Sequence, residues 1–328
     1  MALLRLVAPL VALWFLSGCV ALESVALRTV YTRAALPDAN IRRDLAYVDG
    51  PEADAAKHRL DLFLPLADSV RARPFPTVVY VHGGGWTEGD RGLTFGGQDI
   101  YGNIGRFLAA RGIGAAVISY RLQPGARWNE QVDDVARAVA FVHREIGAYG
   151  GNPRGIVLMG HSAGAQLAAH AALNRAALEA RGVPPEAICG AISVSGAGLD
   201  LTDRRTFELR RNFDYFARRF GPPGGPPGGG AWPDVPPPAP YPWQREASPA
   251  TYARPDAPPY LIIHAEGEGP QFARQAEVFA AALGAAGAGA EQVVQPGSSH
   301  TRILAALSRP DRVAGASVLR FVRSLSCS

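Results

Sequence analysis

The sequence contains little lysine, methionine or cysteine. Lys57 is the only lysine, so arginine carries nearly all of the positive charge, a bias that we attribute to genome composition before function. The formal net charge of +4 is small and scattered along the chain, which gives no reason to expect a nucleic-acid partner. The 3 cysteines fit no metal-binding spacing, and the sequence implies neither a metal nor another cofactor.

The start of the chain also lacks a long apolar run, because residues 6–16 are too few to cross a bilayer as a stable helix. This stretch ends in Leu-Ser-Gly-Cys, which resembles the bacterial lipoprotein signal, where cleavage before the cysteine leaves a diacylated N-terminus. The resemblance implies a signal peptide over residues 1–18, lipidation of Cys19, and a lipid anchor to the bacterial cell envelope, at the outer membrane or in the periplasm. The alternative is an ordinary secretory signal that is cut after Ala21.

The other two cysteines, Cys189 and Cys327, could pair in an oxidising compartment. Cys189, however, lies in an apolar, strand-like run. We therefore expect it to be a buried core residue rather than half of a disulfide.

Strand-like and helix-like segments alternate along most of the chain. Such alternation predicts a mostly parallel sheet with helices on both faces, in which ligands bind at the carboxyl ends of the strands. Hydrophobic residues make up 48% of the chain, enough for a sizeable core. Strands are predicted at residues 58–65, 77–81, 114–120, 155–159, 187–194, 260–264 and 292–294, and helices at residues 100–111, 129–149, 163–173, 271–283 and 313–325.

Three segments do not follow this alternation. Residues 19–44 are predicted to form a tether with a short helix, which leaves residues 45–326 as the folded domain. Residues 221–242 are dominated by glycine and proline and are expected to be a flexible surface insertion, or alternatively a mobile edge of the substrate pocket. Residues 207–220, which are rich in phenylalanine and arginine, predict one or two short cap helices.

Two glycine-rich motifs follow predicted strands. The first is His-Gly-Gly-Gly-Trp at residues 82–86, and the second is Gly-His-Ser-Ala-Gly at residues 160–164. The second fits the Gly-x-Ser-x-Gly nucleophile elbow, in which a sharp strand-to-helix turn presents the serine hydroxyl. The first supplies free backbone N–H groups for the oxyanion that such a serine creates. Together, in this order, the motifs predict a serine hydrolase with Ser162 as the nucleophile.

The other members of a catalytic triad follow from chain order, which in α/β-hydrolases is Ser, then Asp or Glu, then His. His300 is the only histidine after the last predicted strand, and it lies in a loop before a helix, so it is the predicted base. The acid should lie in the loop after the strand at residues 260–264. That loop contains two competing residues, Glu266 and Glu268, and no aspartate.

With these motifs, the chain resembles the HGGG-type esterases of the α/β-hydrolase fold over residues 47–321, close to hormone-sensitive-lipase-like and feruloyl-esterase-like bacterial carboxylesterases. The resemblance implies an eight-stranded, mostly parallel sheet and an oxyanion hole formed by the backbone of Gly84, Gly85 and Ala163. It also implies an acid four residues after a strand-end histidine, where this chain has Glu268 in place of the usual aspartate. Further markers are Leu-Asp-Leu-Phe-Leu-Pro at 60–65, Gly-Asp-Arg at 89–91, Ser-Tyr-Arg-Leu at 119–122, Asp-Asp at 133–134, Tyr-Gly-Gly-Asn-Pro at 149–153 and Ser-Pro at 248–249.

These features predict an envelope-anchored carboxylesterase that hydrolyses a small-molecule ester through an acyl-enzyme on Ser162. His300 would remove the serine proton and later protonate the leaving alcohol. Two alternatives stay open. The same triad could cleave an amide or formamide, as an arylformamidase does, or the chain could be a non-catalytic binding protein on the same fold.

Overall fold

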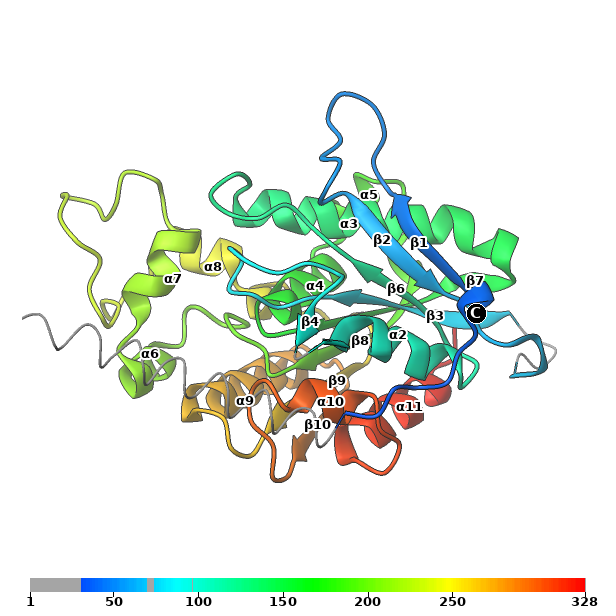
Figure 1. Ribbon diagram of the computed structural model, residues 1–328. Helices are drawn as coiled ribbons and strands as arrows, with labels where there is room; N and C mark the ends of the chain where they lie inside the picture. Colours follow the sequence, from blue (N-terminus) through cyan, green and yellow to red (C-terminus); the bar gives the residue numbers. More distant parts are fainter. Residues whose placement is uncertain (1–30, 70–73, 96, 328) are drawn as a thin grey trace, which may run out of the picture.

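An eight-stranded sheet with helices on both faces forms the centre of the molecule (Figure 1). The computed structural model describes residues 31–69, 74–95 and 97–327. The strand order is β1-β2-β6-β3-β7-β8-β9-β10. Strand β2 runs antiparallel to both of its neighbours, β1 and β6, whereas every other neighbouring pair is parallel.

The central strands are buried on both faces, as expected for a parallel sheet covered by helices. Every residue of β6 is buried, and so are all but one residue each of β3 and β8. The strands of the sheet are β1 (Ile41–Ala46), β2 (Arg59–Phe63), β3 (Phe75–Val81), β6 (Gly114–Ile118), β7 (Gly151–His161), β8 (Ile188–Val194), β9 (Tyr260–Ala265) and β10 (Ala290–Gln295). A separate ladder pairs β4 (Thr94–Phe95) with β5 (Gln98–Asp99).

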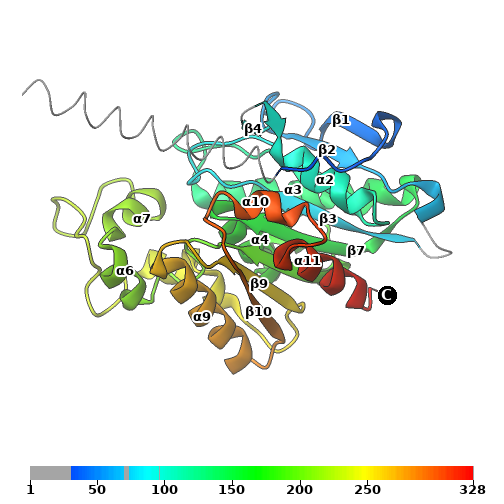
Figure 2. The same ribbon diagram turned by 60° about the horizontal axis from the view of Figure 1, so that its bottom comes forward.

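Two hydrophobic cores lie on opposite faces of the sheet, because successive side chains of a strand point to opposite sides. Val79 and Val81 of β3 belong to the core under α3, α4 and α9, whereas Val78 and Tyr80 belong to the core under α2, α10 and α11 (Figure 2). The helices are α2 (Ile100–Ala109), α3 (Trp128–Glu145), α4 (Ala163–Leu173), α5 (Arg175–Glu179), α6 (Arg204–Arg210), α7 (Phe213–Phe220), α8 (Pro242–Ala247), α9 (Pro270–Ala285), α10 (Ile303–Leu307) and α11 (Val313–Ser324).

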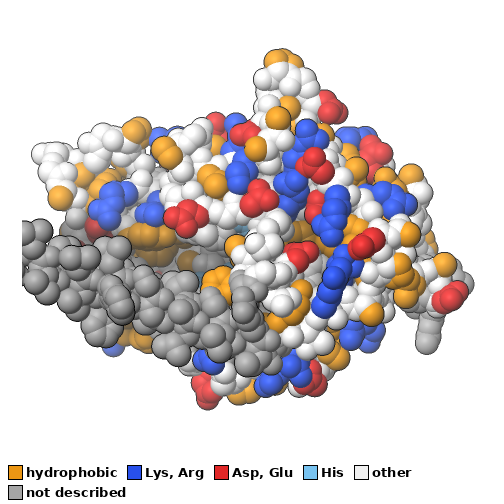
Figure 3. All heavy atoms as spheres, viewed as in Figure 1, with side chains coloured by type: hydrophobic (Ala, Val, Ile, Leu, Met, Phe, Trp, Pro, Cys, Tyr) orange, Lys and Arg blue, Asp and Glu red, His pale blue; other side chains and the backbone are white. Residues whose placement is uncertain are grey.

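The predicted alternation of strands and helices is confirmed, and the cap helices expected within residues 207–220 correspond to α6 and α7. Both helices lie at one end of the molecule, away from β1 and the C-terminus (Figures 1 and 2). On the face seen in Figure 3, basic side chains lie beside acidic ones and do not form a patch of one sign. No helix in the described ranges is both long and apolar enough to span a bilayer.

The expected tether over residues 19–44 is wrong in its second half. Residues 41–46 form β1, which pairs with β2, and residues 31–38 pack along α2. Asn103 of α2 bonds the backbone of Thr32 and Ala34, and Arg106 donates to the carbonyl of Leu36. The strand escaped prediction because it is an edge strand with three exposed charged residues and one buried residue, Ile41. The expected signal peptide and Cys19 lie outside the described residues.

Cys189 and Cys327 form a disulfide, so the expectation of an unpaired, buried Cys189 is wrong. Their Cα atoms are 5.4 Å apart, and the bond ties the tail after α11 to the start of β8. Asn152 Nδ2 donates to the carbonyl of Cys327 at 3.2 Å, and Leu325 packs against Gly190. The apolar sequence around Cys189 correctly indicated a strand, but it carried no information on which segment returns to that strand.

We predict that Cys189→Ser lowers the free energy of unfolding by about 2–4 kcal/mol, because the unfolded chain loses a long-range cross-link. Cys327→Ser and the double variant should lose the same amount, since each removes the same bond. Denaturant unfolding of the four proteins, with and without reductant, measures this. The prediction would be contradicted if the double variant lost the sum of the two single-variant free energies. It would also be contradicted if reductant left the unfolding free energy of the wild-type protein unchanged.

The Gly- and Pro-rich insertion is exposed in its first half and packed in its second. Residues 222–224 and 227–231 are exposed, whereas Trp232 and Tyr241 form an aromatic cluster with Phe213 and Trp243. The backbone N–H of Phe213 also donates to the carbonyl of Asp234 at 2.9 Å. The insertion is therefore a surface segment, as predicted, but its end is anchored on α7 and α8.

Deleting residues 223–230 should leave the melting temperature nearly unchanged, because shortening an exposed loop changes its closure entropy little. Trp232→Ala should lower stability by about 2 kcal/mol through lost aromatic packing. Thermal unfolding of both variants tests the contrast. A large loss in the deletion, or none in Trp232→Ala, would show that the packing is assigned to the wrong half.

Candidate active site

Ser162 lies at the sharp turn between β7 and α4, with φ 55° and ψ −120°. This positive φ is unfavourable for a residue with a side chain and persists only where the surroundings enforce it. The Ser162 N–H donates to the carbonyl of Val194 at 2.9 Å, and its carbonyl accepts from Ala197 N–H at 3.3 Å. A Cβ atom on Gly164 would collide with the carbonyls of Val81 and His82, so the elbow needs glycine there.

The structure brings Ser162, His300 and Glu268 together in one hydrogen-bonded row. His300 Nε2 lies 3.0 Å from Ser162 Oγ, and His300 Nδ1 lies 2.9 Å from Glu268 Oε2. The Glu268 side chain is 1% exposed, and its second oxygen accepts from the backbone N–H of Ala265 at 2.9 Å. A carboxylate in this position orients the imidazole and stabilises its protonated form.

Glu266, the other candidate for the acid, makes a different hydrogen bond. Its Oε2 accepts from the backbone N–H of Gly297 at 2.9 Å. The neighbouring Gly267 N–H donates to the carbonyl of Ser298 at 2.8 Å. Glu266 therefore joins the acid loop to the loop that carries His300, while Glu268 contacts the imidazole.

Two aromatic rings that were not predicted from the sequence contact the His300 imidazole. Phe272 of α9 lies with its ring centroid 4.3 Å away, and His161 lies 4.8 Å away. Burial, and then the nearby His300, lower the pKa of His161 to about 3, so its ring is neutral at ordinary pH. Its Nε2–H then donates to the His300 carbonyl at 2.9 Å. Proximity to Ser162 in sequence was the only available signal for His161, and none existed for Phe272.

Two of the residues predicted for the oxyanion hole belong to a glycine-rich segment that packs on the nucleophile elbow. Gly84 and Gly85 have φ values of 119° and 58°, and this glycine strip, residues 83–86, follows β3. A Cβ on Gly83 would lie 3.2 Å from Ser162 Cβ, so the strip packs directly on the elbow. Ala163 begins α4, where the first N–H groups of a helix have no intrahelical acceptor. These N–H groups and the helix dipole favour a negative charge at this point.

Lys57 and several of the family markers hold the loop that follows the glycine strip. Lys57 Nζ donates to the carbonyl of Gly89 at 2.8 Å and pairs with Asp90 at 3.2 Å. Ser119 Oγ donates to Asp90 at 3.0 Å, and Arg91 bonds both Ser119 and Asp61. These charged residues are therefore structural supports of the loop after the strip.

His82, the first residue of that motif, is fully buried and its Nδ1–H donates to the carbonyl of Gly83 at 2.6 Å. Burial lowers the pKa of His82 to about 4, so the ring is neutral at ordinary pH. It stacks on Tyr120 at a centroid distance of 4.3 Å. His82 thus stabilises the glycine strip through its hydrogen bond to Gly83.

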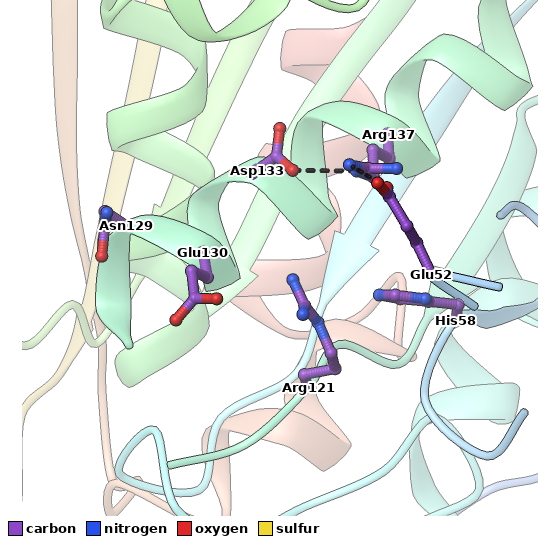
Figure 4. A pocket seen from close by; sticks show the side chains of 7 residues that line it. All are labelled: Glu52, His58, Arg121, Asn129, Glu130, Asp133 and Arg137. Carbon is purple, nitrogen blue, oxygen red and sulfur yellow. Dashed lines mark hydrogen bonds and ion pairs between the residues drawn. The ribbon is translucent and has the colours of Figure 1, made fainter. Parts of the chain in front are cut away.

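A cavity of about 420 Å³ lies elsewhere on the surface, and no residue of the triad lines it (Figure 4). Most of its charged side chains are in ion pairs: Asp133 with Arg137 and Arg181, Arg137 with Glu52, and Arg121 with the buried Asp134. Glu130 accepts from the backbone N–H of Arg127 at 2.7 Å. Burial alone would raise the pKa of Asp134, but hydrogen bonds from His58 and Arg121 hold it below its usual value. The cavity is therefore the hollow of an ion-pair network.

Comparison with known structures agrees with this architecture. Esterase B from Lactobacillus rhamnosis has a TM-score of 0.68 and 19% identity, covering 98% of this chain and 94% of that chain. An esterase from Pyrobaculum calidifontis has a TM-score of 0.64 and 20% identity, covering 95% of this chain and 91% of that chain. A family model described as BD-FAE matches residues 60–185. The chain has the α/β-hydrolase fold.

Several curated relatives of the chain are named esterases. A probable isoprenylcysteine alpha-carbonyl methylesterase of Oryza sativa is 40% identical over 142 residues, 43% of this chain and 31% of the relative. Esterase LipQ of Mycobacterium tuberculosis is 31% identical over 258 residues, 76% of this chain and 55% of the relative. The matches thus span less than two thirds of either relative. The resemblance to α/β-hydrolase esterases inferred from the motifs is confirmed.

The roles of Glu266 and Glu268 can be separated by matched substitutions. Glu268→Gln should lower kcat by two or more orders of magnitude, because the amide cannot stabilise the imidazolium of His300. Glu266→Gln should reduce kcat much less, since an amide oxygen can still accept from Gly297 N–H. Steady-state kinetics on an activated ester measures both. The reverse order of effects would show that Glu266 is the acid.

Proposed function

We propose that this α/β-hydrolase is a serine carboxylesterase that cleaves a small-molecule ester through an acyl-enzyme on Ser162. The observation that carries the proposal is the position of His300 Nε2, 3.0 Å from Ser162 Oγ, with Glu268 on the other imidazole nitrogen. A serine hydroxyl becomes a useful nucleophile only when such a base removes its proton. The esterase names of these curated relatives favour an ester over an amide or formamide.

In this mechanism Ser162 Oγ attacks the ester carbonyl carbon while its proton passes to His300 Nε2. The carbonyl oxygen becomes an oxyanion, which the backbone N–H groups of Gly84, Gly85 and Ala163 stabilise. Collapse of this intermediate breaks the bond to the alcohol oxygen, which takes the proton from His300. A water molecule then repeats the sequence on the acyl-enzyme, releasing the carboxylic acid and restoring Ser162.

We also propose that the mature protein is lipid-anchored to the bacterial cell envelope through Cys19. The Leu-Ser-Gly-Cys sequence supports lipidation at this position. The disulfide between Cys189 and Cys327 supports an oxidising compartment, because such bonds are rare in the cytosol.

Ser162→Ala should abolish turnover of an activated ester without unfolding the protein, because removal of the nucleophile costs several orders of magnitude in kcat. Wild-type protein should be labelled by a fluorophosphonate, and the variant should not. A folded variant retaining more than about a tenth of wild-type kcat would refute the assignment. An unlabelled, inactive wild type would favour the binding-protein alternative, and turnover of an anilide or formamide above that of esters would favour the amidase.

Cys19→Ser should abolish lipidation and leave the protein either released or unprocessed. Intact mass of the mature wild-type chain is the direct measurement, with a diacylated Cys19 as the expected first residue. A mature chain that begins with an unmodified Leu22 would instead support the ordinary secretory signal.

A further inference from the structure

The cap helix α7 contacts the glycine strip through two neighbouring side chains. Arg219 Nε donates to the carbonyl of Gly85 at 2.9 Å. The Tyr215 hydroxyl lies only 2.5 Å from the position that a Cβ atom on Gly85 would occupy. Because Tyr215 and Arg219 are four residues apart, they share one face of α7, while Phe213, Phe216 and Phe220 are buried in the core.

The two side chains also hold each other in place. The Arg219 guanidinium carbon lies 3.5 Å above the centre of the Tyr215 ring, a cation–π contact. Arg219 Nη1 also donates to the Tyr215 carbonyl at 3.0 Å. One guanidinium thus stacks on a ring and donates to two carbonyls at once. A planar fork can do this and a lysine ammonium cannot.

The peptide that Arg219 binds lies between two residues in the left-handed region. Gly85 has φ 58° and Trp86 has φ 67°, which is unusual for a residue with a large side chain. The surroundings must enforce such a conformation. The Trp86 carbonyl accepts from Gln123 N–H at 2.9 Å and from Gln131 Nε2 at 2.8 Å. Within the described residues, the Gly85 carbonyl is held by Arg219 alone.

The preceding peptide carries the Gly85 N–H, one of the proposed oxyanion donors. Its carbonyl, that of Gly84, accepts from Glu88 N–H at 2.9 Å and from Thr87 N–H at 3.2 Å. The peptides before and after Gly85 share its Cα atom. Arg219 therefore bonds the peptide of Gly85 that Thr87 and Glu88 do not bond, at a residue type whose backbone is intrinsically permissive.

We propose that Arg219, supported by the ring of Tyr215, is a positioning residue for the oxyanion hole. Through this pair, the cap helix restrains the peptide after Gly85, so that the peptide carrying the Gly85 N–H is restrained at both of its ends. The proposal rests on the proposed esterase function, because an oxyanion exists only during acyl transfer. The pair should then affect stabilisation of the tetrahedral intermediate and leave ground-state binding of the ester largely unchanged.

Arg219→Met tests this, with Arg218→Met as the matched control. Arg218 directly precedes Arg219 in α7, is 61% exposed and pairs with Asp214. In Arg219→Met, kcat should fall about tenfold with KM within about twofold, and a trifluoromethyl ketone that forms a serine hemiketal should bind about tenfold more weakly. Arg218→Met should match the wild type in both measurements. Equal behaviour of the two variants would overturn the proposal.

Arg219→Lys and Tyr215→Ala keep the proposal testable if Arg219→Met does not fold. Arg219→Lys retains the charge, so wild-type kcat in this variant would overturn a positioning role. Tyr215→Ala removes the support under the guanidinium and should lower kcat and ketone affinity together. A rise in KM with kcat and ketone affinity unchanged would contradict the proposal.

Fluorophosphonate labelling distinguishes a failure of the proposed esterase function from a failure of the proposed role of Arg219. A wild-type protein that is not labelled would refute the esterase function itself. A labelled wild type, together with an Arg219→Met variant that matches it in kcat and ketone affinity, would refute only the role of Arg219.

Discussion

The site depends on one backbone turn, in which Ser162 is held at a positive φ between β7 and α4. The turn is enforced from two sides. The carbonyl of Val194 and the N–H of Ala197 bond the Ser162 backbone from the β8 side, and the end of β3 packs so closely on Gly164 that no side chain fits there. The ends of β3, β7 and β8 therefore meet at Ser162. This convergence brings the glycine strip, the nucleophile and the start of α4 within contact of each other.

The acid and base reach this point on two loops that are joined to each other. Strands β9 and β10 are parallel neighbours, so their carboxyl ends lie side by side. Glu266 and Gly267 then bond the loop after β10, which places His300 between Glu268 and Ser162. Glu268 reaches the imidazole while also accepting from Ala265 N–H, so a glutamate fits at the position where the family resemblance implies an aspartate.

Local patterns were sufficient to predict the buried strands and the amphipathic helices. The apolar runs that became β3, β7 and β8 are continuous because helices cover both faces of the sheet, and the glycine motifs lie at the carboxyl ends of β3 and β7. β1 was missed because an exposed edge strand carries charges where a central strand carries valine. The disulfide and the contact between Arg219 and Gly85 join segments that are 138 and 134 residues apart, and no local pattern reports such pairings. The choice between Glu266 and Glu268 likewise came from family spacing, since both side chains follow the same strand.

A crystal structure of the protein after reaction with a fluorophosphonate tests the central claim most directly. We expect phosphorus bonded to Ser162 Oγ, with the phosphoryl oxygen within hydrogen-bond distance of the N–H groups of Gly84, Gly85 and Ala163. The His300 imidazole should still lie between the adduct and Glu268, with a hydrogen bond to Glu268 through Nδ1. A phosphonate attached to another residue, or a phosphoryl oxygen directed away from the glycine strip, would contradict the account.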